Sequence, residues 1–550
     1  MKSSAFVLPT DRPVPATQPD GPFRTFHAMV AQQARQQPQV TALVTGADVW
    51  TYAQLDAFAN RVASALQRDG CVAKGTVAIC AANSNAYMGV WIGAQRAGLA
   101  IAPLAPSSTV AQLIGMVTDA GATHFFMDAA VAAAIGAVAV SARRIRLDDS
   151  GDERDDERED ERDDEKDAST PLTEWLAPNG STPLAVDIQA DWPFNVIYSS
   201  GTTGTPKGIV HLNTYRWEQA WRATSYGPDT VTLIATPLYS NTTLVAVLPA
   251  LAHGGQVVLM PKFSAEKYLQ LAQQHRATHT MLVPVQYQRL MALPTFDDYD
   301  LLSFRFKSST SAPFAADLKA DILARWPGAL IEYYGMTEGG ASCVLFAHLT
   351  PDKLHTVGQP ALGHEIRLID EAGKEVAPGE TGEVVGRSSV MMSGYHNQPG
   401  KTSEAEWFDA QGKRFIRHGD VARFDADGFL ILMDRRKDMI ISGGFNVFPS
   451  DLEAEIKRHP DVAEVAVVGV PSKEWGETPV AYVVRRSDAT VSAPALRTLV
   501  NASLGKTQRI ADLMFIAELP RSAIGKVLKR ELRATYQNER QAEQLAEKQS

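Results

Sequence analysis

The stretch YSSGTTGTPKG, residues 198–208, combines glycines, hydroxyl side chains and one lysine in a single short segment. It follows the apolar run at residues 194–197, which predicts the end of a strand, so the segment is expected to be a loop that leaves a sheet. Glycines let backbone N–H groups turn toward a ligand, and the hydroxyls and the lysine add further donors. The loop therefore predicts a phosphate-binding site.

The loop does not match the Walker pattern. Lys207 is followed by Gly208 rather than by Ser or Thr, and the glycine spacing differs from that of a P-loop. These differences disfavour kinases and GTPases of the P-loop class. Taken alone, the same composition also fits a plain flexible turn.

The length and the charge of the chain limit the classes of protein that it can be. A chain of 550 residues is longer than one hydrophobic core usually organises, so two or more domains are expected. The net charge of −10 is local, because residues 148–167 hold fourteen acids and four basic residues. Outside this run the charges balance, which gives no nucleic-acid signature. We interpret the run as a surface insertion; a tether for a basic partner is the alternative.

Neither membrane insertion nor secretion is indicated. The longest apolar run, residues 129–140, is shorter than the roughly 18 residues that a spanning helix needs. The N-terminal segment has a single Lys and no apolar core before its prolines, so a cytoplasmic location is expected. The three cysteines are too few and too widely spaced for a disulfide framework or a zinc site.

The pattern of apolar residues predicts an α/β fold. Thr51 and Gln54 have capping-box spacing at the start of an amphipathic helix that stops at Gly70. Short β-rich runs such as residues 75–80 and 256–260 alternate with helical patterns, which predicts layered α/β subdomains with mostly parallel sheets. Past about residue 360, closely spaced hairpins predict a β-rich subdomain.

The C-terminal part predicts a separate, small α+β domain. A helix at residues 450–458, strands at 462–468 and 480–484, and a helix from Ala493 follow one another there. The predicted organisation is an N-terminal extension (1–24), a large N-terminal domain (25–436) with the acidic insertion at 148–167, a C-terminal domain (437–535) and a frayed polar tail (536–550).

Five motifs give this chain a resemblance to the adenylate-forming superfamily, which includes acyl- and aryl-CoA ligases, peptide-synthetase adenylation domains and luciferases. They are YSSGTTGTPKG (198–208), EYYGMTEGG (332–340), RHGDVARFDADGFL (417–430), DRRKDMIISGGFNVFPSDLEAEI (434–456) and RSAIGK (521–526). They occur in the family's order, and the resemblance covers roughly residues 25–535. It implies a large AMP-binding domain and a small mobile C-terminal domain.

The resemblance implies that ATP activates a carboxylic acid as an acyl adenylate. The charge that builds on the phosphate oxygens must then be met by cations and N–H donors. Thr337 is expected at the α-phosphate and Glu338 at Mg²⁺, a hard cation that prefers oxygen ligands. The β- and γ-phosphates are expected to lie within the loop, against Ser199, Ser200, Gly201, Thr202, Thr203, Gly204 and Lys207.

By the same resemblance, Tyr334 flanks adenine, Asp420 accepts the ribose hydroxyls, and Arg435 supports the ribose or phosphate. A structural ion pair between Asp420 and Arg435 is the alternative interpretation. Lys526 is similar to the lysine that bridges the carboxylate, the ribose and the α-phosphate during adenylation.

A second half-reaction, with coenzyme A, requires Lys526 to withdraw from the site. The resemblance implies that the C-terminal domain rotates about Lys437 and that Gly443 and Gly444 then line a pantetheine tunnel. Glycine permits such a close approach. An ordinary turn at the two glycines is the alternative.

The resemblance places the acyl pocket at Tyr239, Ser240, Ser311, Gly335 and Gly339. Many aryl and acyl ligases carry His where Ser240 stands, so a close copy of a benzoate or coumarate site is not expected. The apolar, uncharged segment after Ser240 fits an aromatic, alicyclic or medium-chain acid better than an amino acid. His211 and His418 flank motifs, but the sequence indicates no role for them.

The sequence thus predicts an ATP-dependent carboxylic acid–CoA ligase. The alternatives are a ligase that loads a carrier-protein pantetheine and a nucleotide-binding regulatory protein without catalysis. The chain ends about 24 residues after Lys526 with no carrier segment, which favours CoA. The expected partners are ATP, CoA and a small carboxylic acid, and a homodimer is left open.

Overall fold

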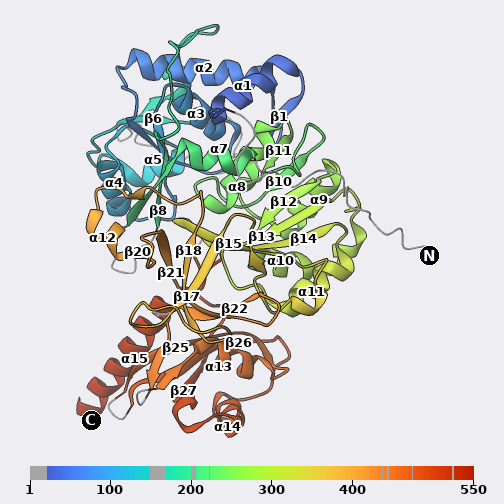
Figure 1. Cartoon of the computed structure of the whole chain (residues 1–550), viewed down its shortest axis with the longest axis vertical. Helices are drawn as coiled ribbons and strands as arrows, with labels where there is room; N and C mark the ends of the chain where they lie inside the picture. Colours follow the sequence, from blue (N-terminus) through green and yellow to red (C-terminus); the bar gives the residue numbers. More distant parts are fainter. Residues whose placement is uncertain are drawn as a thin grey trace, which may run out of the picture. The chain divides into compact units, whose positions relative to one another are not determined.

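The structure is a computed structural model of the whole chain (Figure 1). It describes residues 22–148, 169–199, 206–221, 223–435, 438–442, 445–472, 475–522 and 525–549. Its contacts divide the chain into two compact units. The first holds residues 1–354, 360–365 and 386–416, and the second holds 355–359, 366–385 and 417–550. The acidic insertion predicted at 148–167 lies outside the described residues, except for Asp148.

One large sheet of the first unit is mostly parallel, as the sequence predicts. Its core strands β1, β10, β11, β12, β13 and β14 run parallel to their neighbours, whereas β2 and β15 are antiparallel additions. In spatial order its strands are β16 (Gln359–Pro360), β15 (Gly339–Phe346), β14 (Ala329–Met336), β13 (Phe306–Ser309), β12 (His279–Leu282), β10 (Val231–Ile234), β11 (Gln256–Leu259), β1 (Thr41–Thr45) and β2 (Asp48–Thr51).

A second sheet carries the predicted phosphate loop. Strands β8, β4, β3, β5, β6 and β7 run parallel to one another. At the edge, β9 is antiparallel to β8, and β19 is antiparallel to β9. In spatial order they are β19 (Gly394–Tyr395), β9 (Lys207–Leu212), β8 (Pro193–Ser199), β4 (Ala100–Pro103), β3 (Thr76–Cys80), β5 (Ala122–Met127), β6 (Arg143–Arg146) and β7 (Thr170–Pro171).

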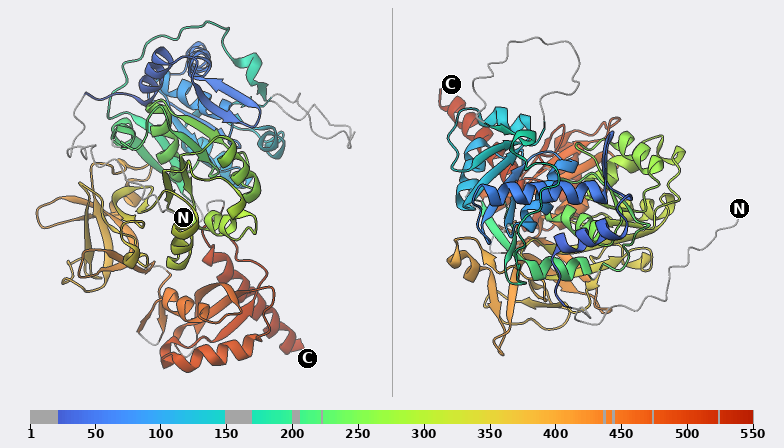
Figure 2. Two further views of the ribbon diagram at one scale, coloured as in Figure 1. Left: turned by 90° about the vertical axis from the view of Figure 1, so that its right-hand side faces the viewer. Right: turned by 90° about the horizontal axis from the view of Figure 1, so that it is seen from above.

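Helices cover these sheets and share one core with both of them (Figure 2). Leu43 and Val257 of one sheet, Ile79 and Ile101 of the other, and Val62 of α2 belong to the same buried cluster. The helices of the first unit are α1 (Phe26–Gln36), α2 (Tyr52–Arg68), α3 (Asn85–Arg96), α4 (Val110–Asp119), α5 (Ala129–Ile135), α6 (Leu172–Trp175), α7 (Asn213–Trp221), α8 (Asn241–Ala252), α9 (Ala265–Gln274), α10 (Pro284–Met291), α11 (Ala316–Arg325) and α12 (Pro399–Glu404).

The capping box predicted at Thr51 is present. The Thr51 side chain accepts from the N–H of Gln54, and the Gln54 side chain accepts from the N–H of Thr51, so α2 begins as the sequence predicts. The helix buries Leu55, Val62 and Leu66 on one face.

The predicted β-rich segment is built around the long strand β21 (Arg414–Phe424). Its beginning pairs with β20 (Glu406–Phe408) in the first unit, and its end pairs with β22 (Leu430–Arg435) in the second. β17 (Glu365–Ile369) and β18 (Gly382–Arg387) are neighbours in the same sheet. β21 and β22 form an antiparallel hairpin of the kind that the sequence predicts past residue 360.

The C-terminal segment of the second unit is the α+β structure that the sequence predicts. α15 packs beside β25 (Figure 1). The elements are β23 (Ile440–Ser442), β24 (Phe445–Val447), α13 (Pro449–Lys457), β25 (Val462–Ser472), β26 (Gly476–Arg485), α14 (Ala493–Ser503), β27 (Asp512–Phe515) and α15 (Lys529–Gln549).

The polar tail predicted at 536–550 is helical to residue 549. Residues 536–549 continue α15 without a break. Tyr536 packs against a cluster of this unit, and Arg540 forms an ion pair with Asp512 at 2.5 Å, so tertiary contacts hold the helix where its own sequence offers no apolar stripe.

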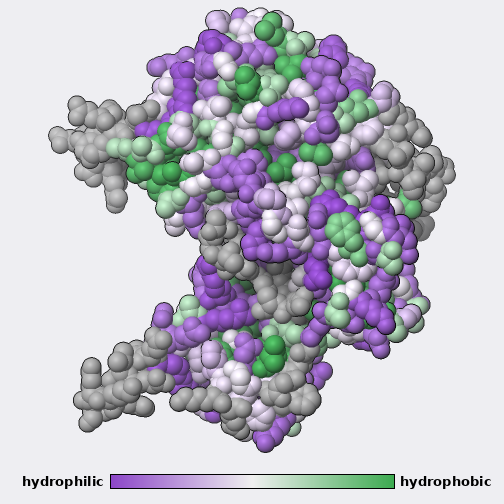
Figure 3. Space-filling view, turned by 60° about the vertical axis from the view of Figure 1, so that its left-hand side comes forward, coloured by the Kyte–Doolittle hydropathy of each residue, from purple (hydrophilic) through white to green (hydrophobic). Residues whose placement is uncertain are grey.

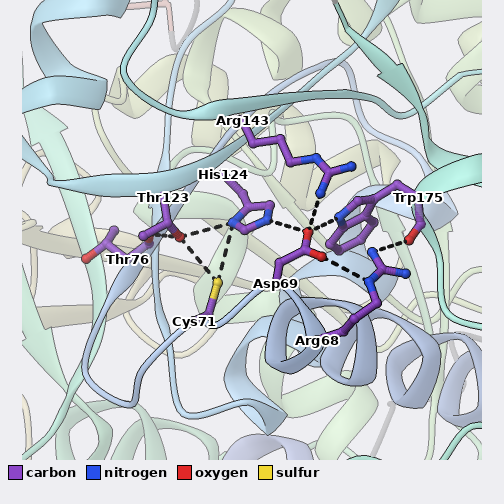
Figure 4. A network of polar contacts seen from close by, with 8 residues as sticks. All are labelled: Arg68, Asp69, Cys71, Thr76, Thr123, His124, Arg143 and Trp175. Carbon is purple, nitrogen blue, oxygen red and sulfur yellow. Dashed lines mark hydrogen bonds and ion pairs between the residues drawn. The ribbon is translucent and has the colours of Figure 1, made fainter.

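A polar network joins several elements of the first unit around Asp69, which follows α2 (Figure 4). The Asp69 carboxylate accepts from Trp175 Nε1 at 2.8 Å, from Arg143 at 2.8 Å and from His124 Nε2 at 3.1 Å. Arg68 donates to its other oxygen at 3.0 Å. The network therefore connects α2, β5, β6 and α6.

None of the helices in the described ranges is long and apolar enough to cross a membrane. On the face drawn in Figure 3, hydrophilic residues and small hydrophobic groups are intermixed.

Candidate active site

The predicted phosphate loop connects two antiparallel strands. β8 ends at Ser199, β9 begins at Lys207, and these two residues face each other in the ladder. The sequence predicts the strand before the loop; the structure adds the strand that returns. Ser200, Gly201, Thr202, Thr203 and Gly204 lie outside the described residues.

Thr337 and Glu338 form the tight turn between β14 and β15. Met336 and Gly339 are partners across this hairpin, so the two residues between them project from its tip. Gly339 has a φ of +80°, and a Cβ built on it would lie 2.2 Å from the carbonyl oxygen of Val390. Only glycine allows the turn to pack against that backbone.

Tyr395 brings Lys207 and Glu338 to one place. The Tyr395 hydroxyl donates to Oε1 of Glu338 at 2.8 Å, and Lys207 Nζ lies 4.9 Å from the centre of the Tyr395 ring. Burial, assisted by the Glu338 carboxylate, raises the pKa of Tyr395, so the hydroxyl keeps the proton that it donates. Two motifs that are far apart in the sequence therefore meet, and no sequence pattern predicted the tyrosine that joins them.

The Glu338 carboxylate suits a hard cation. Tyr395 bonds one of its oxygens, and within the described ranges no other side chain forms an ion pair or hydrogen bond with that carboxylate. An anionic oxygen ligand is the donor chemistry that Mg²⁺ prefers, and Glu338 lies near Lys207 of the predicted phosphate loop.

The predicted acyl-pocket residues lie where three parallel strands end. Tyr239 and Ser240 follow β10, Ser311 follows β13, and Gly335 is at the end of β14. The carboxyl edge of a parallel sheet is where α/β folds bind ligands. The hydroxyls of Thr242 and Ser311 lie 2.5 Å apart and connect two of these segments.

Two tyrosines at the end of β14 differ in their exposure. Tyr334, predicted beside adenine, is 8% exposed, whereas Tyr333 is 37% exposed. Ser240 caps α8 by accepting from the N–H of Thr242 at 3.3 Å.

Asp420 and Arg435 belong to the second unit, where they are partners in the antiparallel ladder of β21 and β22. The structure therefore brings these two predicted nucleoside residues together along the backbone.

Lys526 lies on a tight turn that is fixed to its own unit. Its N–H donates to the Ser522 hydroxyl at 3.2 Å, and its carbonyl accepts from the Ser522 N–H at 2.9 Å. Arg521 holds the turn by donating to the carbonyl of Gly525 and to the carboxylate of Glu464 on β25. The predicted hinge residue Lys437 and the predicted tunnel residues Gly443 and Gly444 lie outside the described residues.

The second unit also has a basic pocket that the sequence did not reveal. Its volume is about 630 Å³. Lys506 lies 5.3 Å from the ring of Trp475, so one wall combines a cation with an aromatic face. The lining includes Ser442, Trp475, Arg497, Asn501, Lys506 and Arg509.

Comparison with known proteins identifies the family. The family model described as "AMP-binding enzyme" matches residues 30–396, and the model "AMP-binding enzyme C-terminal domain" matches residues 451–526. The chain is an AMP-binding enzyme.

Its relatives among curated proteins agree over nearly the whole chain. A feruloyl-CoA synthase from Amycolatopsis sp. is 32% identical over 92% of this chain and 98% of its own length. The 4-coumarate–CoA ligase 2 of Nicotiana tabacum is 29% identical over 90% of this chain and 91% of its own length. The ATP-bound structure of MatB from Rhodopseudomonas palustris superposes with a TM-score of 0.79 at 30% identity, covering 93% of this chain and 99% of that chain.

These findings confirm the predicted family, fold and class of reaction. This AMP-binding enzyme is an ATP-dependent, AMP-forming acid–thiol ligase, and its substrates are a carboxylic acid, ATP and coenzyme A. The roles of single residues, the acid and the domain boundaries stay predictions.

Proposed function

We propose that this ligase adenylates a hydrophobic carboxylic acid with the groups that meet at Tyr395. In this proposal Lys207 and the loop hold the β- and γ-phosphates, Thr337 donates to the α-phosphate, and Glu338 holds Mg²⁺. The observation that carries the proposal is the contact of Tyr395 with both Glu338 and Lys207, because it places an anion suited to a metal beside a cation suited to phosphate.

The chemistry explains the need for both charges. An oxygen of the acid attacks the α-phosphorus, a new P–O bond forms, and pyrophosphate leaves with the electrons of the broken bond. Donors that are fixed before the reaction stabilise the charge that develops on the phosphate oxygens. Bound Mg²⁺ neutralises phosphate charge, while Lys207 and Lys526 of the chain supply the remaining positive charge.

The second unit supplies the nucleoside and acid contacts in this proposal. Asp420 accepts from the ribose hydroxyls, Arg435 supports the ribose or phosphate, and Lys526 donates to the reacting carboxylate. The contacts of Lys526 support this role, because its N–H donates to the Ser522 hydroxyl and Arg521 donates to the carbonyl of the preceding Gly525.

The acid is hydrophobic in this proposal. Residues 236–252, which follow β10 and form the start and body of α8, include no Asp, Glu, Lys or Arg. A pocket lined by such residues favours an aromatic, alicyclic or medium-chain acid, because an ammonium group would lack a partner there.

The acceptor is coenzyme A rather than a carrier-protein pantetheine, and the basic pocket of the second unit supports this choice. Arg497, Lys506 and Arg509 suit the phosphates of the CoA nucleotide, and Trp475 offers a face for its adenine. A carrier protein presents pantetheine without that nucleotide. Ser442 also lines the pocket, next in sequence to the predicted tunnel glycines.

The first experiment measures AMP release from a panel of carboxylic acids, with and without CoA, and the mass of each product. Aryl and medium-chain acids are expected to give thioesters, and amino acids are expected to give none. Rapid thioester formation on a carrier protein but not on CoA would overturn the choice of acceptor.

The second experiment tests the catalytic lysine. Lys526→Ala is expected to lower the rate of adenylation by about 10²- to 10³-fold, because one donor to a developing charge is lost. Pyrophosphate exchange measures this rate. The same variant is expected to convert isolated acyl adenylate to thioester at nearly the wild-type rate. Near-normal exchange would contradict the assignment.

The cytoplasm, where ATP and CoA are available, is the location that fits this reaction. A homodimer stays a prediction that light scattering can test.

A further inference from the structure

A buried polar network lies behind the Thr337–Glu338 turn, and none of the five sequence motifs accounts for it. Its members are Asn195 on β8, His211 on β9 and Arg216 on α7, with exposures of 0%, 0% and 1%. The two strands are those that flank the phosphate loop. Two of the three network residues therefore lie on the strands that flank the phosphate loop.

The contacts fix the tautomer of His211. Arg216 donates to Nδ1 of His211 at 3.0 Å, and Asn195 Nδ2 approaches the same atom at 3.1 Å. Arg216 also donates twice to Oδ1 of Asn195, which orients that amide with its nitrogen toward the ring. Because a guanidinium cannot accept a hydrogen bond, Nδ1 must be the acceptor and the proton resides on Nε2.

The proton on Nε2 points to the active-site turn. His211 donates through it to the carbonyl oxygen of Thr337 at 2.6 Å. The Tyr215 ring stacks on the imidazole of His211, with ring centres 4.2 Å apart, and limits rotation of the imidazole. Burial and the Arg216 charge lower the pKa of His211, which keeps the ring neutral and the tautomer unchanged.

We propose that His211 is a positioning residue for adenylation, which sets the Thr337–Glu338 turn relative to the phosphate loop. The inference rests on the proposed roles of Thr337 and Glu338 at the α-phosphate and Mg²⁺. His211 touches no substrate; it acts through the backbone of Thr337. β9 carries both Lys207 and His211. One strand therefore positions the lysine proposed to bind phosphate and also the histidine that holds the Thr337–Glu338 turn.

Arg216 contributes more than a hydrogen bond. Its hydrogen-bond partners among the described residues are Asn195, His211 and Gln219, and none of them is a carboxylate. Arg216 therefore forms no ion pair with these partners, and its charge strengthens the donor at Nε2 by polarising the imidazole ring.

The experiment compares two amide substitutions at one position. In His211→Asn, the short amide reaches the Nδ1 position and can accept from Arg216, but it does not reach the Thr337 carbonyl. In His211→Gln, the longer amide can accept from Arg216 and also donate to Thr337. The two variants thus separate the buried contact from the contact with the turn.

His211→Asn is expected to lower kcat of pyrophosphate exchange about 30- to 100-fold, the size of effect that a displaced catalytic group produces. The KM for ATP is expected to change less than about threefold, and thioester formation from isolated acyl adenylate less than about twofold. His211→Gln is expected to retain exchange within about fivefold of wild type.

The matched control is His124→Asn, a buried histidine of the Asp69 network in the same unit. It is expected to lower Tm while leaving the exchange kcat of the folded protein unchanged. Equal exchange in His211→Asn and His211→Gln, or an equal loss in both half-reactions, would overturn the positioning role.

A further variant separates this inference from the proposed function. If Glu338→Gln exchanges normally, the proposed metal site fails. If Glu338→Gln is inactive and His211→Asn is normal, only the inference about His211 fails.

Discussion

His124 and His211 are two buried histidines of the same unit whose networks end differently. His124 donates through Nε2 to the Asp69 carboxylate, and the surrounding donors are Arg143, Trp175 and Arg68 (Figure 4). His211 donates through Nε2 to the carbonyl of Thr337 instead, and Arg216 stands behind it.

The two rings differ in the charged side chain that forms a hydrogen bond with each of them. Burial lowers the pKa of both histidines, but Asp69 counteracts this effect at His124, whereas Arg216 adds to it at His211. In the Asp69 network the donors and the carboxylate pair with one another inside the fold, so the network is expected to contribute to the stability of the folded state. The His211 network ends on the turn that we propose to contact the α-phosphate and Mg²⁺, so its expected contribution is to the geometry of that turn. The group that accepts the Nε2 hydrogen bond of a buried histidine thus indicates whether the histidine serves stability or positions another residue.

The largest expected effect lies at the end of the His211 network. Glu338→Gln keeps the shape of the side chain and removes its charge, so adenylation is expected to fall about 10²- to 10³-fold. Pyrophosphate exchange over a Mg²⁺ titration measures it. If this loss were no larger than that of a substitution in the Asp69 network, the contrast between the two regions would disappear.

A smaller effect is expected at Tyr395. Tyr395→Phe keeps the ring beside Lys207 and removes the hydroxyl that orients Glu338, so a loss of about tenfold in exchange and a higher Mg²⁺ requirement are expected. Tm is expected to stay close to wild type. An unchanged Mg²⁺ dependence would show that the hydroxyl does not orient the carboxylate.

In the Asp69 network the expected change is in stability, with no change in rate. Asp69→Asn places an amide against the Arg143 and Trp175 donors, and we expect it to cost about 2 to 3 kcal/mol of unfolding free energy. Urea unfolding measures the loss, and exchange by the folded variant is expected to equal wild type.

Arg143→Gln is the matched control for that substitution. The Arg143 side chain is 47% exposed, so its ion pair is expected to contribute less than about 1 kcal/mol. A loss as large as that of Asp69→Asn would mean that the surface arm, rather than the buried donors, carries the stability.

The smallest expected effect is a dependence of the unfolding free energy on pH in the acid range. Burial alone would raise the pKa of the Asp69 carboxyl, but hydrogen bonds from Arg68, Trp175 and His124 lower it from 3.8 to about 2. Because the folded pKa lies below the unfolded one, the contribution is complete above about pH 4 and is lost as the pH falls toward 2. The difference in unfolding free energy between wild type and Asp69→Asn should therefore narrow over that interval.

Much of the fold was predictable because local signals agreed with it. The Thr51–Gln54 capping box, the alternation of β-rich runs with amphipathic helices, and the hairpin turns all appear where the pattern placed them. The packing of the tail beyond residue 536 was not predictable in this way, because it includes a contact of Arg540 with Asp512, which is distant in the sequence. Local composition carries no information on such a partner.

The candidate site was predictable to the extent that its residues stand in motifs. Lys207, Thr337 and Glu338 were placed by their motifs, and the structure brings Lys207 and Glu338 to Tyr395. Tyr395 and His211 were missed because each acts through a long-range contact with one atom. The basic pocket was missed because Trp475, Arg497 and Arg509 come from separate segments.

The close approach of Gly339 to Val390 limits how this enzyme could evolve. A methyl group at position 339 would collide with a main-chain oxygen, and that same segment holds Glu338 through the N–H of Met392 at 2.8 Å. Variation there is expected to disturb Glu338, the proposed metal ligand, before it alters the choice of acid. Lineages that acquire new substrates should therefore change Ser240, Ser311 or the exposed Tyr333 and leave this glycine untouched.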